Sequence, residues 1–167
     1  MLKHTNTCQK EFSKLIDNYQ GIINKVSRAY FSNSEDRKDN FQEVVYQLWV
    51  SKDNLRDKSK IASWIYRVAI NTSIVRLKKN SKIVYKENIF EKDMAYQDYE
   101  ENNKEDRIEQ LYAAINKLNE VERAIIILYL DEKSYSEISE ICGISKSNVG
   151  IKIMRSKNKL KQLLKNI

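Results

Sequence analysis

The sequence predicts an all-α fold in which two small helical domains are joined by a flexible linker. Three observations support this prediction. The 167 residues include no proline and three glycines, whereas a sandwich or a barrel needs frequent turn residues. Apolar residues recur at steps of three and four along most of the chain, which is the period of an amphipathic helix. The apolar content of 41% is enough for a core, so wholesale disorder is excluded.

Three helices are predicted in the N-terminal half, each with an apolar stripe that faces the other two. The first stripe consists of Phe12, Leu15, Ile16, Tyr19, Ile22, Ile23, Val26 and Tyr30. The second consists of Phe41, Val44, Val45, Leu48 and Trp49. The third consists of Ile61, Ile65, Val68, Thr72 and Val75, widened by Trp64 and Ala69. We expect a three-helix domain with its aromatic residues in the core.

The C-terminal half begins with an apolar stripe of Ile108, Leu111, Ile115 and Leu118. Asn119, with Glu122 three residues later, predicts the cap of a helix over 121–130. Ser134 and Glu137 match a capping box, in which each side chain satisfies a backbone donor of the other residue. Gly143 then supplies a left-handed turn that a residue with a Cβ would resist.

A second short helix follows the turn at Gly143. Ser145 caps it, and Val149, Ile153 and Leu160 face inward. From Lys146 to the C-terminus there are seven basic residues and no acid. Two short helices around a glycine turn, the second of them basic, indicate a helix-turn-helix with a DNA recognition helix. Ile151 and Met154 are unusual on its outer face; they either contact thymine methyl groups or pack against the domain.

The net charge of +7 indicates an acidic partner, either nucleic acid or an anionic membrane. Residues 1–80 carry +7, residues 81–109 carry −4 and residues 110–167 carry +4. Two basic blocks are thus separated by an acidic segment that has no sustained apolar period. We interpret this segment as a linker. The alternative for part of it is a solvated helix face. The longest apolar run, 124–130, is far shorter than the roughly 20 residues that span a bilayer. We therefore expect no membrane insertion and a cytoplasmic, nucleoid-associated protein.

No feature of the sequence indicates an enzyme. The single histidine is His4, near the N-terminus, and there is no glycine-rich phosphate loop. Cys8 and Cys142 stand apart, with no second cysteine or histidine at metal-ligand spacing. We expect no catalytic residues, no metal and no cofactor.

One face of the third predicted helix carries a row without an acid, interrupted by Ile74 and lying beside Trp64. The row consists of Lys60, Ser63, Arg67, Asn71 and Lys78. Such a row is either a solvent-exposed polar face or a nucleic-acid surface, and the missing acids favour the second interpretation.

Three motifs in this order resemble the sigma-70 family of bacterial transcription initiation factors, and specifically its short extracytoplasmic-function type, which has only regions 2 and 4. The segment 39–49, DNFQEVVYQLW, is similar to the D-x-x-Q-E-x-F-x-x-x-W pattern of region 2. The segment 63–72, SWIYRVAINT, is similar to its W-L-Y-R-I-A-x-N-T stretch. Residues 134–160 resemble region 4. Asn40 departs from the acid or small residue common at its position, with little effect expected, and Gly150 and Ile151 depart from the Arg or Ser common in relatives.

The resemblance implies a role for specific residues. Asp39, Gln42, Glu43 and Tyr46 would dock on the clamp helices of the polymerase. The −10 strand would be contacted by Trp64, Arg67, Asn71, Arg76, Lys78 and Lys79, with the Asn71 amide reading a flipped base. The −35 duplex would be read by Ser145, Lys146, Ser147, Asn148, Lys152, Arg155 and Lys157.

The resemblance also implies domains and partners. Region 2 is expected over 8–80, the acidic linker over 81–106 and region 4 over 107–167. The implied partners are core RNA polymerase, through its clamp helices and the flap of its large subunits, promoter DNA and an anti-sigma factor. The alternative is a stand-alone helix-turn-helix regulator, which accounts for 134–167 but not for the row around Asn71.

Overall fold

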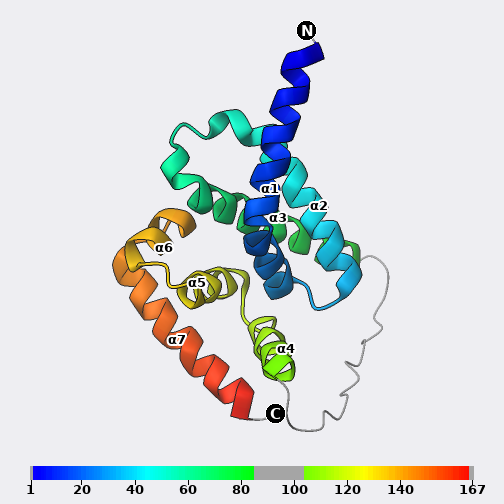
Figure 1. The fold of residues 1–167 in the computed structure, drawn as a ribbon. Helices are drawn as coiled ribbons and strands as arrows, with labels where there is room; N and C mark the ends of the chain where they lie inside the picture. Colours follow the sequence, from blue (N-terminus) through cyan, green and yellow to red (C-terminus); the bar gives the residue numbers. More distant parts are fainter. Residues whose placement is uncertain (1, 85–103, 166–167) are drawn as a thin grey trace.

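The structure is a computed structural model that describes residues 2–84 and 104–165, and every regular element in these ranges is helical (Figure 1). The all-α prediction is confirmed. The first three helices contact one another in one bundle, and the last four form a second bundle. The helices are α1 (Leu2–Tyr30), α2 (Ser34–Ser51), α3 (Ile61–Val84), α4 (Lys104–Ile115), α5 (Glu120–Leu130), α6 (Tyr135–Cys142) and α7 (Lys146–Lys165), with the short 3-10 turns η1 (Lys52–Asn54) and η2 (Lys58–Lys60) before α3.

Local capping residues determine where several helices begin and end. The capping box of Asn119 and Glu122 opens α5, and that of Ser134 and Glu137 opens α6, both as predicted. The backbone of Ser134 donates to the Glu137 carboxylate, which holds the pKa of that carboxyl below its ordinary value. Gly143 ends α6 with a φ of 68°, in the left-handed region that glycine tolerates best.

The core of the first bundle joins α1, α2 and α3 through apolar side chains and one polar link. Fully buried residues include Val26 on α1, Leu48 on α2 and Ile65 on α3. Asn40 is also fully buried, and its Nδ2 donates to Ser27 Oγ at 3.0 Å and to Ser73 Oγ at 2.9 Å. From the sequence we expected little effect of having Asn at position 40 in place of the residue common in the family. The sequence did not reveal this link, in which Asn40 joins all three helices inside the core.

Helix α5 is the most buried helix of the second bundle. Its residues 124–128 are all buried, since α5 contacts α6 and α7 and also α1 of the first bundle. A helix covered on all sides is apolar all round, which explains why this segment carries a continuous apolar run instead of a periodic stripe.

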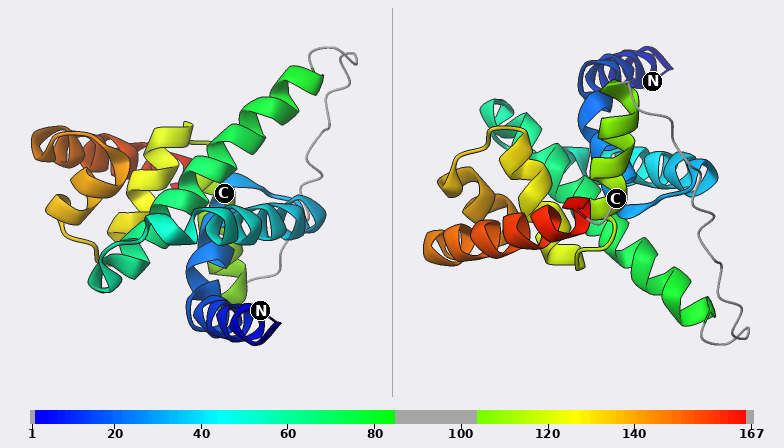
Figure 2. Two further views of the ribbon diagram at one scale, coloured as in Figure 1. Left: turned by 90° about the horizontal axis from the view of Figure 1, so that it is seen from above. Right: turned by 90° about the horizontal axis from the view of Figure 1, so that it is seen from below.

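The two bundles pack directly against each other. The Tyr30 hydroxyl donates to the Glu120 carbonyl oxygen at 2.6 Å, and Arg123 donates to the Tyr30 carbonyl oxygen at 3.2 Å. Burial raises the pKa of Tyr30 well above its ordinary value, so the phenol stays protonated and remains a donor. Both views in Figure 2 show α5, α6 and α7 on one side of α1 and α3, with α2 on the other side.

The predicted linker lies mostly outside the described residues. Helix α3 continues to Val84, four residues beyond the expected end of the first domain, and α4 begins at Lys104. Residues 85–103 of the expected linker 81–106 are not among those described.

Candidate nucleic-acid interface

The row predicted on α3 lies on the surface of that helix. Lys60, Arg67, Asn71 and Lys78 are exposed, while Ser63 is half-buried. Helical spacing brings these residues to one side of α3, as the sequence predicted. Trp64 is half-buried and packs against the core of the first bundle, so only part of its ring is available for stacking on a base.

Asn71 lines a shallow hollow between α2 and α3. Its amide is exposed, and Lys79 and Arg76 line the same hollow. From α2 come the side chains of Glu43 and Gln47, which hydrogen-bond to each other at 2.9 Å. An exposed amide beside two cations offers both a donor and an acceptor within reach of an anionic strand.

Arg76 connects two groups of residues that the sequence predicted separately. Its Nη2 pairs with the Asp39 carboxylate at 3.0 Å, and Asp36 lies at 3.9 Å from the same atom. Asp39 was predicted to contact the polymerase and Arg76 to contact DNA. In the structure the two side chains neutralise each other, so Arg76 is less available to a phosphate than Lys78 or Lys79.

Lys60 and Arg67 contact the second bundle, which the sequence did not predict. Lys60 Nζ lies 2.7 Å from a carboxylate oxygen of Glu140, and Arg67 Nη2 donates to the Glu140 carbonyl oxygen at 2.9 Å. The hydrogen bond between Lys60 and Glu140 holds the pKa of the lysine above its ordinary value and that of the glutamate below it. Glu140 lies on α6, so part of the α3 row meets the helix-turn-helix.

The residues predicted to contact the polymerase share one face of α2. Asp39, Gln42 and Tyr46 are exposed and Glu43 is half-buried, at spacings of three and four residues. Tyr46 is 59% exposed, which is high for a large aromatic side chain. An exposed aromatic residue beside acidic and amide groups is typical of a protein-binding surface.

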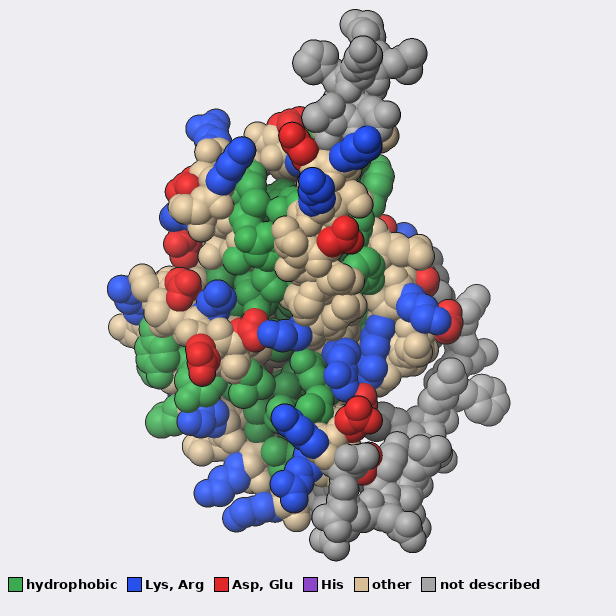
Figure 3. Space-filling view, in the orientation of Figure 1, with side chains coloured by type: hydrophobic (Ala, Val, Ile, Leu, Met, Phe, Trp, Pro, Cys, Tyr) green, Lys and Arg blue, Asp and Glu red, His purple; other side chains and the backbone are tan. Residues whose placement is uncertain are grey.

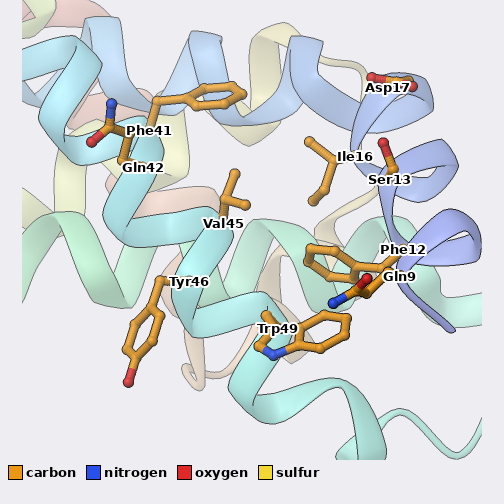
Figure 4. A pocket seen from close by; sticks show the side chains of 10 residues that line it. All are labelled: Gln9, Phe12, Ser13, Ile16, Asp17, Phe41, Gln42, Val45, Tyr46 and Trp49. Carbon is orange, nitrogen blue, oxygen red and sulfur yellow. The ribbon is translucent and has the colours of Figure 1, made fainter. Parts of the chain in front are cut away.

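An open groove between α1 and α2 borders this face (Figure 4). Phe12 and Trp49 line it, with ring centroids 5.0 Å apart in an edge-to-face arrangement, and Gln42 and Tyr46 line its other part. The sequence predicted Phe12 and Trp49 as core residues. Periodicity correctly assigned them to the inner stripes of their helices, but the helices leave the groove open at this point.

The helix-turn-helix forms as predicted. Ser145 Oγ accepts a hydrogen bond from the Asn148 backbone N–H at 3.3 Å, and Val149, Ile153 and Leu160 are buried. The predicted DNA contacts on the segment are exposed, apart from the half-buried Lys152. The exposed ones are Ser145, Lys146, Ser147, Asn148, Arg155 and Lys157.

Ile151 and Met154 do not pack against the domain. Ile151 is 44% exposed and Met154 is 58% exposed, so the packing alternative is wrong. Figure 3 shows hydrophobic side chains at the surface over the start of α7, and basic side chains further along the same helix.

Within residues 2–84 and 104–165, no helix is both long enough and apolar enough to cross a bilayer.

Two family models match the chain. The model for sigma-70 region 2 matches residues 15–83, and the model for sigma-70 region 4 matches residues 108–160.

Curated relatives and solved structures are similar over most of the chain. RNA polymerase sigma factor SigZ of Bacillus subtilis is 35% identical, over 79% of this chain and 75% of that protein. The ECF RNA polymerase sigma factor SigW of the same organism is 26% identical, over 95% and 91%. The sigma factor RpoE of Bartonella quintana, solved with the anti-sigma factor NepR, has a TM-score of 0.76 at 20% identity, over 93% of this chain and 98% of that chain. CnrH, solved with the cytosolic domain of CnrY, has a TM-score of 0.61 at 19% identity, over 95% and 90%.

Proposed function

This chain belongs to the sigma-70 family of RNA polymerase sigma factors, in its extracytoplasmic-function subfamily, and we propose that α2 docks on the polymerase while α3 and α7 contact promoter DNA. A sigma factor of this type binds core RNA polymerase and directs transcription initiation through the −10 and −35 elements. The proposal assigns each of these contacts to residues of this chain. It requires no covalent chemistry from the chain itself.

The exposed face of α2 is the proposed contact with the clamp helices. Asp39, Gln42 and Tyr46 offer an acid, an amide and an aromatic ring side by side, in a protein that is otherwise basic. Because an acidic surface repels phosphates, it is selective for a protein partner over DNA. We propose that the groove of Phe12 and Trp49 extends the same docking surface, since Gln42 and Tyr46 border both. Region 4 would meet the flap of the large subunits.

The hollow at Asn71 is the proposed site for the melted −10 strand. An extruded base offers donors and acceptors on one edge, which a carboxamide matches with one group of each kind. Lys78 and Lys79 are exposed about two turns further along α3 and are suited to phosphates of that strand. Arg76 is expected to act mainly by orienting Asp39, with which it pairs.

The exposed face of α7 is the proposed reader of the −35 duplex. Helix α7 contains several cations and no acidic residue, so all of its charges attract the phosphates of DNA.

We propose region 2 over 8–80, the acidic linker over 81–106 and region 4 over 107–167. Two of the solved relatives are bound to NepR and to the cytosolic domain of CnrY, and we propose that an anti-sigma factor likewise holds this chain. We propose that it acts in the cytoplasm, at the nucleoid.

The observation that carries the proposal is the pairing of an exposed amide hollow on α3 with a basic helix-turn-helix in the same chain. The test is reconstitution of the full chain with core polymerase and transcription from a randomised promoter library. We expect initiation at promoters that share two elements. The alternative, a stand-alone regulator, predicts DNA binding without polymerase binding, so a chain that binds DNA but not core polymerase would contradict the proposal.

A Tyr46→Ala variant tests the α2 contact directly. We expect weaker binding to core polymerase with unchanged binding of free protein to duplex DNA, because Tyr46 is on a different surface from α7. Val50→Ala is the matched control, since Val50 is also on α2 and 58% exposed but is not among the predicted contacts. Equal losses in the two variants would count against a specific role of Tyr46.

A further inference from the structure

The outward face of α7 carries two large apolar side chains that no fold requirement explains. The inward face is formed by Val149, Ile153 and Leu160, which are buried. At about 100° per residue, Ile151 lies almost opposite this face and Met154 lies beside Ile151. Both are well exposed, at 44% and 58%. Burying these two side chains would have stabilised the free chain, yet both remain in contact with water.

The surroundings of these two residues indicate what covers them. Ser147 and Arg155 are exposed on the same outward side of α7, and the helix contains no acidic residue. A protein partner with an apolar surface would have to bury or pair the Arg155 guanidinium. A nucleic acid pairs it with a phosphate and leaves only the apolar side chains to be matched. Complementarity of charge therefore favours DNA.

The major groove offers one apolar group to an α-helix, the C5-methyl group of thymine. We propose that Ile151 and Met154 read thymine methyl groups in the −35 element, which rests on the proposed function that α7 enters this groove. Their Cα atoms are separated by about 4.5 Å along the helix axis. In zinc-finger proteins, residues three positions apart on the helix in the major groove contact successive bases. The two side chains thus reach neighbouring base pairs, and the element contains two thymines at adjacent or nearly adjacent positions.

Tyr135 continues this surface toward α6. It is 46% exposed, and its ring lies over Gly150, where an added Cβ would be 3.4 Å from Tyr135 Cε2. Tyr135 therefore adds an exposed apolar group close to the residue that precedes Ile151.

The test replaces each thymine of the selected −35 element by deoxyuridine, which removes the methyl group and keeps the base pair. Binding of the full chain to the duplex is measured for wild type, Ile151→Ala, Met154→Ala and Val121→Ala. Val121 is the matched control because it is 40% exposed but belongs to α5. We expect about a fourfold loss of affinity per critical methyl group for wild type and Val121→Ala. Each α7 variant should lose this sensitivity at one thymine.

The possible results separate this inference from the proposed function. Duplex binding that is insensitive to deoxyuridine at every position would overturn the inference and leave the proposed function intact. Failure of the wild-type chain and of its polymerase complex to bind any duplex would overturn both. If Ile151→Ala weakens binding to core polymerase and leaves the deoxyuridine effect unchanged, the exposed pair contacts protein, and the inference is wrong.

Discussion

The guanidinium of Arg67 on α3 donates a 2.9 Å hydrogen bond to the carbonyl oxygen of Glu140 on α6. Lys60, seven residues earlier at the end of η2, pairs with the carboxylate of the same glutamate at 2.7 Å. Both cations belong to the predicted polar row, Lys60 at the end of η2 and Arg67 on α3, and the family resemblance implies that Arg67 contacts the −10 strand. We therefore expect a promoter strand and α6 to compete for Arg67.

Reversing the charge of Glu140 tests this competition. In Glu140→Lys, the new ammonium faces Lys60 and Arg67, and repulsion replaces the ion pair. Lysine is favourable near the C-terminal end of α6, so the helix itself is not weakened. We expect the free variant to bind a fluorescent single-stranded −10 oligonucleotide several-fold more tightly than wild type, as measured by anisotropy.

The added charge needs its own control. Glu105→Lys changes the net charge by the same amount at an exposed position on α4, outside the contact with α3. If the two variants gain equally, the effect comes from charge alone and the competition is disproved.

Asn71→Ala tests the reading of the −10 base. The methyl group that remains cannot hydrogen-bond to a base, so we expect weaker promoter melting and a loss of sequence preference at one −10 position, while binding to core polymerase is unchanged. Promoter melting is followed by permanganate reactivity and core binding by titration. Asn80→Ala is a control on the same helix. An equal loss of melting and core binding in Asn71→Ala would argue for a structural role.

Arg155→Ala tests the contact of α7 with the DNA backbone. Arg155 is exposed, and we propose that it contributes about one phosphate contact. We expect the slope of log affinity against log salt concentration to fall by about 0.9, uniformly across promoter sequences. Lys117→Ala removes an exposed cation from the turn after α4 and should leave the slope unchanged. A sequence-dependent loss for Arg155→Ala would instead assign this residue to base reading.

Asn40→Ala tests the polar link inside the first bundle. It removes a donor to Ser27 and Ser73 and leaves a small buried void. We expect the free energy of unfolding to fall by about 1–3 kcal/mol in urea denaturation. Asn24→Ala, at an exposed position of α1, should change it by less than about 0.5 kcal/mol. A neutral Asn40→Ala would show that the link adds no stability.

The Cys142 thiol provides a test of how tightly α6 is packed. Burial raises its pKa from 9.0 to about 11. The thiolate is the form that reacts, and at pH 8 this pKa leaves about a hundredfold less thiolate than the ordinary value would. In a Cys8→Ser background, where Cys142 is the only thiol, we expect alkylation at pH 8 to be about a hundredfold slower than in urea. Comparable rates in the two conditions would show that α6 is loosely held.

Much of the fold could be predicted because its signals are local. The capping boxes at Asn119 and Ser134 and the turn at Gly143 involve residues within a few positions of each other, so their spacing alone determines the geometry. Apolar stripes and capping signals together predicted the seven α-helices of residues 2–84 and 104–165 for the same reason, apart from the ends of these helices. The predicted polar row on α3 and the basic face of α7 are likewise properties of single helices, and their exposure is confirmed for Arg67, Asn71, Arg155 and Lys157.

The sequence by itself therefore determined the helices, their inner faces and the family resemblance. Only the tertiary structure decided which surfaces meet: that Arg67 contacts Glu140, that Arg76 pairs with Asp39 and that Asn40 is enclosed by three helices. It also decided that Phe12 and Trp49 border an open groove and that Ile151 and Met154 remain exposed. The physical reason is range. Helical periodicity acts between residues three or four apart, whereas these contacts depend on how separate helices pack and on where the packing leaves a side uncovered.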